Sequence, residues 1–263
     1  MILTLNILPM LNSTQHNYLL QLTNYLPERR KGKRGPNTIS KSIIIPELYK
    51  LFKTNCGWRN INHPTVCRNY LDEIQRRGLL QKFLKNITKD ILKHRPPIMI
   101  IDTSDIVSYR TKPSILFSGK YHNYCQKLSL IVTDCCVPVY GDLHKGSEPD
   151  STIFDTVLTR LDKLAYEFFG DKGFEKYERR RDLAKRNCQV RIEMKKYKKN
   201  KKLGRRFSFT EKQRAIRGGI EKVMAWIKSF GACILNRLRT KSLFKAMFLF
   251  CLSYVAFMRV EKL

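Results

Sequence analysis

The sequence predicts a mixed α/β protein whose sheet is preceded by an all-α segment. Pro96 and Pro97 mark the change: apolar residues recur at helical spacing before them, and short β-rich apolar runs follow. After the prolines the expected order is three strands, a helix, two strands and further helices, which defines a mixed α/β domain. The 263 residues suffice for two domains, which we expect at 1–95 and 96–263.

The first segment predicts a small helical bundle. Residues 14–26 have helical spacing with Thr14 at the N-cap, and a second helix begins at Pro46, a residue suited to the first turn. Residues 65–94 predict one or two more helices, broken near Gly78. Basic bundles of this kind include helix-turn-helix DNA-binding domains and dimerisation modules, and the pattern leaves both open.

The second segment alternates strand and helix patterns. Residues 98–102 form a short apolar run that ends in a carboxylate, and two further strands make an antiparallel meander with it. The remaining elements are expected at 127–134 and 137–146 (strands), 150–165 (helix), 166–171 and 188–192 (strands), and from 211 to the C-terminus (helices).

Charge and composition limit the class of protein. Lys and Arg number 51 against 22 Asp and Glu, an excess that favours nucleic acid or an anionic membrane as the partner. The apolar run 246–258 is too short to span a bilayer comfortably and predicts a buried helix, so no membrane is expected. The eight cysteines show no C-x-x-C spacing, which argues against a zinc site and for reduced thiols. The expected location is the cytoplasm, in association with the nucleoid.

Three carboxylates stand out in this basic chain. Asp102 and Asp171 each follow an apolar strand-like run, and Glu221 shares a helical face with Arg217 and Lys228 at offsets of four and seven. By itself such a stripe is most simply a solvated helix face held by ion pairs. A carboxylate that faces a polyanion needs a cation between them, and hard divalent cations such as Mg2+ take oxygen ligands.

Several motifs resemble those of the DDE transposases of bacterial insertion sequences, which have ribonuclease H-like catalytic cores. The segments DTS at Asp102 and GDKGF at Asp171 resemble the first and second aspartate motifs, and Arg217, Glu221 and Lys228 fit the R-x3-E-x6-K signature. CGWRNI resembles the family's C-x-W-R-D motif, YLPERRKGKRGP its basic arm and KGSEPDSTIFD its G-x-x-H-D-S segment. The resemblance covers nearly the whole chain.

The resemblance implies metal-dependent cleavage at the ends of a mobile element and strand transfer into target DNA. Asp102, Asp171 and Glu221 would be the catalytic residues and the ligands of two Mg2+ or Mn2+ ions. Double-stranded DNA, both element ends and target, would be the partner, bound by a homodimer. The DNA-binding residues would be Arg217, Lys228, Lys172 and, in the basic loop 195–206, Lys195, Lys196, Arg205 and Arg206.

Two departures from the family pattern leave an alternative open. Arg214 occupies the position of the signature tyrosine, and Pro149 that of the usual histidine. A glycine pair, Gly218 and Gly219, also lies just before Glu221. The alternative is a transposase-derived DNA-binding protein that has lost catalysis.

Trp58 is expected in the core of the helical bundle rather than on DNA. Asp105, Asp134 and Asp142 are expected to cap turns, and Asp150 to be an N-cap or a residue that supports the site. His122 and His144 are expected to be polar surface residues or DNA contacts rather than metal ligands.

Overall fold

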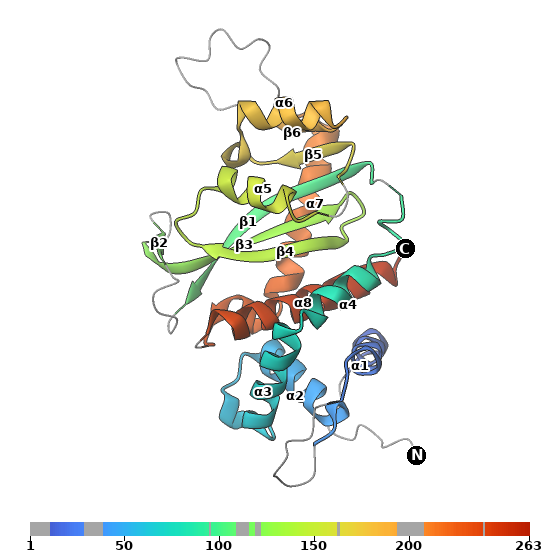
Figure 1. Cartoon of the computed structure of the whole chain (residues 1–263), viewed down its shortest axis with the longest axis vertical. Helices are drawn as coiled ribbons and strands as arrows, with labels where there is room; N and C mark the ends of the chain where they lie inside the picture. Colours follow the sequence, from blue (N-terminus) through green and yellow to red (C-terminus); the bar gives the residue numbers. More distant parts are fainter. Residues whose placement is uncertain are drawn as a thin grey trace.

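The structure is a computed structural model of the whole chain. It describes residues 11–28, 39–94, 96–108, 116–118, 122–161, 164–193, 208–238 and 240–263. The N-terminal helices lie at one end of the molecule and the sheet with its helices at the other, and the last long helix crosses between them (Figure 1).

The helices and strands have the following bounds. The helices are α1 (Ser13–Tyr25), α2 (Lys41–Thr54), α3 (Pro64–Arg76), α4 (Leu79–Ile87), α5 (Asp150–Leu158), α6 (Tyr177–Lys185), α7 (Glu211–Lys228) and α8 (Lys241–Val260), with 3-10 turns η1 (Trp58–Asn60), η2 (Lys172–Phe174) and η4 (Gly231–Cys233). The strands are β1 (Ile98–Ser108), β2 (Leu116–Ser118), β3 (Asn123–Thr133), β4 (Pro138–Lys145), β5 (Glu167–Gly170), β6 (Gln189–Ile192) and β7 (Leu235–Asn236).

Two helix starts differ from the sequence prediction. Asn12, not Thr14, caps α1, in a capping box with Gln15. Helix α2 begins after Ser40, whose side chain accepts a hydrogen bond from the backbone, so Pro46 lies in the helix interior. Burial of the apolar residues just before the proline stabilises this longer helix despite the lost backbone hydrogen bond. The predicted break at Gly78 is confirmed, with φ of 63°.

The sheet confirms the expected fold class. Strands β4, β3 and β1 form the antiparallel meander, and β5 and β6 continue the sheet parallel to β1, while the short β2 and β7 pair with β3 and β1. This order, antiparallel on one side of the first strand and parallel on the other, is the ribonuclease H-like arrangement.

Strand β1 is longer than predicted. It stays paired with β3 from Met99 to Val107, so Asp102 lies within the strand and does not end it. Asp105, whose neighbours suggested a turn, is also within β1. The partner strand supplies the hydrogen bonds that keep this polar half of β1 extended, and the sequence of β1 alone does not reveal them.

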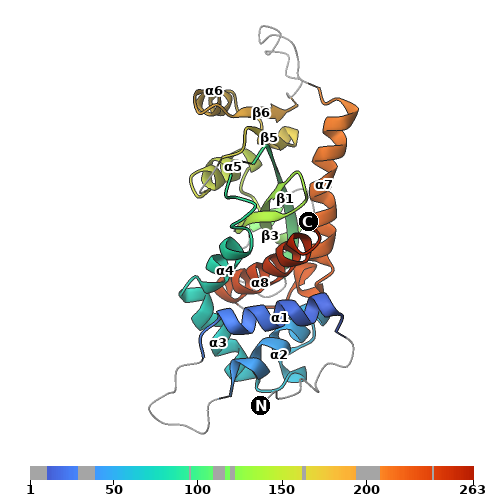
Figure 2. The same ribbon diagram turned by 90° about the vertical axis from the view of Figure 1, so that its right-hand side faces the viewer.

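Helices cover both faces of the sheet. Helices α5 and α6 lie on one face and α7 on the other (Figure 2). The two faces belong to separate apolar clusters, since Met99 and Ile101 pack with the α5 side and Ile100 with the side that carries α7 and α8. Successive residues of β1 therefore point to opposite layers.

Helix α8 joins the N-terminal helices to the sheet. A Cβ built on Gly141 in β4 would lie 2.7 Å from Phe248 of α8, which explains a glycine at this close crossing. On its other side α8 accepts a hydrogen bond of 2.9 Å at the Phe250 carbonyl from the Tyr18 hydroxyl. By length and composition α8 is apolar enough to cross a membrane, but 78% of its apolar window is buried inside the protein, as the sequence predicted for 246–258.

Candidate active site

The sheet brings Asp102 and Asp171 to the same level on neighbouring parallel strands. The pairing of β1 with β5 joins Ile98 to Glu167 and Ile100 to Phe169, an offset of 69 residues. The same offset separates Asp102 from Asp171, which directly follows the end of β5. Because side chains alternate across a sheet, residues at the same level with this register share a face.

Burial dominates the electrostatics of Asp102. The pKa of Asp102 is raised to about 6, chiefly by burial, and the negative charges of Asp171 and Asp150 act in the same direction. The hydrogen bond of 2.8 Å from the Thr103 backbone N–H and the positive charge of Arg217 act in the opposite direction. The net rise shows that the effect of burial on this carboxylate exceeds the stabilisation from its hydrogen bond and from Arg217.

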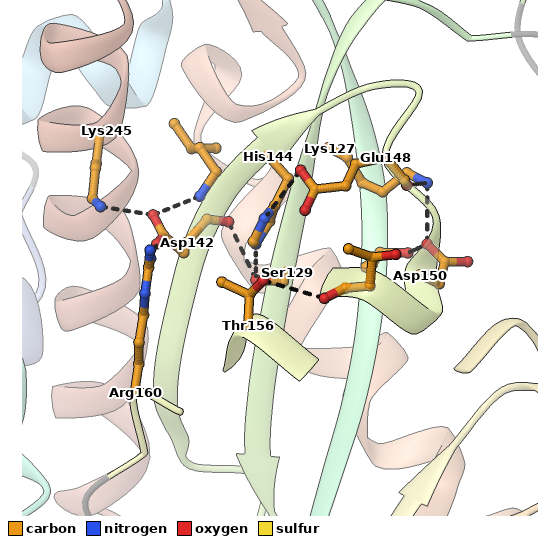
Figure 3. A network of polar contacts seen from close by, with 12 residues as sticks. Lys127, Ser129, Asp142, His144, Glu148, Asp150, Thr156, Arg160 and Lys245 are labelled. Carbon is orange, nitrogen blue, oxygen red and sulfur yellow. Dashed lines mark hydrogen bonds and ion pairs between the residues drawn. The ribbon is translucent and has the colours of Figure 1, made fainter. Parts of the chain in front are cut away.

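Asp150, at the start of α5, contacts β1, β3 and η2. Its Oδ1 accepts hydrogen bonds from the Thr103 hydroxyl in β1 (2.9 Å) and from Nζ of Lys127 in β3 (3.1 Å). A Cβ built on Gly173 in η2 would lie 2.6 Å from Oδ2 of Asp150. Figure 3 shows the Lys127–Asp150 contact and the second hydrogen bond of Lys127, 2.9 Å to the carbonyl of Glu148.

Sequence reasoning missed Lys127 and was wrong about one of the two roles considered for Asp150. Asp150 is not the N-cap of α5, because Pro149 occupies that position and Asp150 is the first helical residue. Its role as a residue that supports the site stays a prediction. The D-S motif at Asp150 and the glycine of GDKGF were the features of the sequence that could have indicated the contacts of Asp150. The contact of Asp150 with Lys127, at a sequence separation of 23 residues, depends on the packing of α5 over the sheet.

Glu221 is connected to this cluster through Arg217. Its side chain is 67% exposed and pairs with Arg217 at 3.7 Å, one helical turn before it in α7. Arg217 is therefore the group that interacts with both Glu221 and Asp102. Glu221 does not appear among the main influences on the pKa of Asp102, in contrast to Asp171 and Asp150.

The donor atoms of Asp102 and Asp171 suit a hard divalent cation. Carboxylate oxygens are the ligands that Mg2+ and Mn2+ prefer, and a cation would stabilise the charged form of the buried Asp102. Within the described ranges, no three His, Cys, Asp or Glu side chains lie close enough together to hold a metal ion. Asp102 and Asp171 have donor atoms suited to a cation, and Glu221 would have to turn from Arg217 to join them.

The other expected DNA-binding residues have different surroundings. Lys172 pairs with Glu193 at 3.0 Å, and Lys228 is the partly buried last residue of α7. The remaining four expected residues, Lys195, Lys196, Arg205 and Arg206, lie outside the described residues.

A second polar network lies on β3 and β4, beside the Lys127–Asp150 contact (Figure 3). The His144 ring bonds to Ser129 at 2.8 Å, and both side chains are buried, so His144 is not the surface residue that the sequence suggested. The expectation that Asp142 caps a turn is also wrong. It lies within β4 between Arg160 and Lys245, whose Nζ is 2.7 Å from its carboxylate.

The sheet has a ribonuclease H-like strand order, and Asp102 and Asp171 lie at one level, Asp102 in β1 and Asp171 directly after the neighbouring β5. The family profile described as "Transposase DDE domain" matches residues 93–256, more than half of the chain. The chain therefore belongs to the transposase DDE domain family. The match covers Asp102, Asp171 and Glu221.

Solved structures of transposases are among those to which the chain is similar. One is a piggyBac transposase synaptic complex with hairpin DNA, at 10% identity and a TM-score of 0.48, covering 92% of this chain and 71% of that one. Another is the Mos1 strand transfer complex, at 12% identity and a TM-score of 0.28, covering 79% and 82%. The search of curated proteins gave no significant match.

Proposed function

We propose that this protein is an active transposase that cuts DNA at the ends of a mobile element and joins the freed 3′ hydroxyl to target DNA. The observation that carries the proposal is the common level of Asp102 and Asp171 on parallel neighbours, with Asp150 next to them. The formal net charge of +29 supports a polyanionic substrate. A homodimer, one copy for each element end, is the form that we propose for the DNA complex.

Asp102, Asp171 and Glu221 would hold the divalent cations. Two such ions, when bound, stabilise the charge on the attacking and leaving oxygens of an in-line displacement at phosphorus. Strands β1 and β5 keep Asp102 and Asp171 in fixed positions, and Glu221 approaches from α7 once Arg217 releases it. Arg217 then becomes free to donate two hydrogen bonds to a DNA phosphate beside the scissile bond.

Lys127 and Thr103 would be positioning residues. Both donate to one oxygen of Asp150, so the other oxygen stays directed toward η2, the segment that follows Asp171. This arrangement links β1, β3 and η2 and limits movement of the two carboxylates relative to each other.

One observation favours a second candidate function, that of a DNA-binding protein without catalysis. Glu221 is mostly exposed and engaged with Arg217. If this pair is permanent, only two of the three carboxylates can take a cation, and DNA binding would continue without cleavage.

The test uses the full chain and duplexes taken from the DNA that flanks its coding sequence. We expect Asp102→Asn, Asp171→Asn and Glu221→Gln each to abolish cleavage with Mg2+ or Mn2+ while binding to the duplex persists in a gel-shift assay. Asp182→Asn, an exposed carboxylate on α6, is the matched control and should cut as the wild type does.

A second measurement does not depend on activity. Mg2+ or Mn2+ should raise the melting temperature of the wild type and of the Asp182 variant, and fail to do so for Asp102→Asn. Normal cutting by Glu221→Gln would remove Glu221 from the site. Wild-type protein that binds these duplexes but never cuts them would favour the second candidate function.

A further inference from the structure

Two adjoining cavities lie where the N-terminal helices meet the C-terminal segment. The larger, of about 770 Å³, is lined by η1 and the start of α3, and the smaller, of about 510 Å³, by the end of α2 and by β7. Gly57, Trp58 and Arg237 line both. We call the two together the Trp58 groove.

The charged residues that line the larger cavity are all positive. Three arginines, Arg59, Arg68 and Arg237, line it, and no carboxylate is among the described residues that line it. All three are exposed, and across the described ranges none of them forms an ion pair. Three guanidinium groups without acidic partners form a site for an anion, because each offers several donors to phosphate oxygens.

Trp58 has one side on the core and another in the groove. Its side chain is partly buried and packs against the apolar cluster, as the sequence predicted, yet it also lines both cavities. A fixed indole beside arginines is the combination that single-stranded nucleic-acid sites use, since a base stacks on the ring while guanidinium groups hold its phosphates. A cavity of this volume lies in the range of about 300–1,000 Å³ typical of small-ligand pockets, so one unpaired nucleotide can enter.

The groove is also within reach of the candidate active site. Strand β7 beside it pairs with β1 at Val107, five residues beyond Asp102. At about 3.3 Å per residue, this is roughly 16 Å along the strand. A DNA strand covers that distance in about five nucleotides at 3.4 Å each.

We propose that the Trp58 groove binds an unpaired nucleotide of the DNA substrate, with its base on Trp58 and its phosphates on Arg59, Arg68 and Arg237. The proposal rests on the proposed function, because it takes DNA as the substrate. It adds a single-stranded subsite that lies outside the carboxylate cluster.

The chain offers a direct reporter for this contact. It has two tryptophans, so Trp226→Phe leaves Trp58 as the only one. In this variant of the full chain, oligo(dT) should quench the tryptophan fluorescence, because a stacked base quenches indole emission. A blunt duplex, whose bases are all paired, should bind with much less quenching.

Two variants test the groove without removing core contacts. Gly57 has φ of −70°, and a Cβ on it meets nothing within 4 Å, so Gly57→Leu should fill the groove while the fold persists. Arg68→Gln removes one groove cation, and Arg76→Gln removes an exposed cation elsewhere on α3 as its control. Thermal melts of all variants verify that they fold.

The expected result is selective. Gly57→Leu should weaken oligo(dT) binding about 5- to 150-fold, the range for losing one stacked base, and leave blunt-duplex affinity within about twofold. Arg68→Gln should weaken oligo(dT) binding more than Arg76→Gln does. Oligo(dT) binding without quenching, or unchanged by Gly57→Leu, would overturn the groove proposal alone. Equal losses for blunt duplex would also overturn it, whereas a wild type that binds no DNA would overturn the proposed function as well.

Discussion

Replacing Gly173 by alanine should disturb the candidate active site through one identifiable contact. The new Cβ would lie 2.6 Å from Oδ2 of Asp150, whereas ordinary contact begins at about 3.4 Å, so the carboxylate has to retreat by about 0.8 Å. Its Oδ1 would then lose good geometry with Thr103 at 2.9 Å and Lys127 at 3.1 Å.

The size of the effect follows from this overpacking. Forcing extra volume into a packed site costs about 1–3 kcal/mol of folding free energy. For a chain of this length, that corresponds to a fall in melting temperature of roughly 2–12 °C. Misplacement of an active-site group by about 1 Å can lower the rate about 100-fold, so DNA cleavage should fall by up to that factor.

The assay is a double-mutant cycle measured by thermal unfolding. In an Asp150→Ala background the obstructing carboxylate is absent, so Gly173→Ala should cost little further stability. Gly218→Ala is the control, because its Cβ meets nothing within 4 Å and it lies inside α7, where alanine stabilises by about 0.5–1 kcal/mol. If Gly173→Ala costs the same with and without the Asp150 carboxylate, the steric explanation is refuted.

Three further predictions concern the polar networks and the signature cations. Burial lowers the pKa of His144, so the folded state prefers the neutral ring and loses stability as pH falls below about 6.5. The free energy of unfolding in urea, measured at pH 7.5 and 5.5, should therefore depend less on pH for His144→Gln than for the wild type. Lys245→Met should cost about 1.5–3 kcal/mol in the same unfolding assay, because it removes a charged hydrogen bond to the buried Asp142, and a cost near zero would contradict this. Arg217→Lys should reduce the cleavage rate at saturating metal more than Lys228→Arg does, because only arginine offers a planar fork of donors to phosphate. If both variants cut DNA normally but melt at a lower temperature, the two residues have a purely structural role.

The spacing of apolar residues along the sequence was sufficient to predict much of the fold. The apolar run before Asp171 predicted a buried strand that ends at a carboxylate, and β5 ends at Gly170 as expected. The fold class and the meander followed from the order of such runs. The segment of β1 after Asp102 was not predictable in the same way, because its polar residues are extended only through pairing with β3.

Contacts between distant segments limited the prediction of the site. Lys127 begins an apolar run and carries no motif of its own, so its hydrogen bond to Asp150 depends on the register of β3 and the position of α5. The exposure of Glu221 and its pairing with Arg217 followed more directly, since an offset of four places both on one helical face. Local spacing thus predicted the ion pair within α7, while the β3–α5 contact required the tertiary structure.

The common level of Asp102 and Asp171 depends on a register that hydrophobic pattern alone does not determine. Phe168 and Phe169 are both buried, on opposite faces of β5, so a slip by one residue would keep apolar side chains on each face while turning Asp171 away. Gly170 distinguishes the two registers. A Cβ on it would lie 3.0 Å from Cγ2 of Ile101, so the larger Phe169 could not occupy that position in a shifted strand. The glycine before Asp171 therefore fixes which residue of β1 faces that carboxylate, and this residue is Asp102.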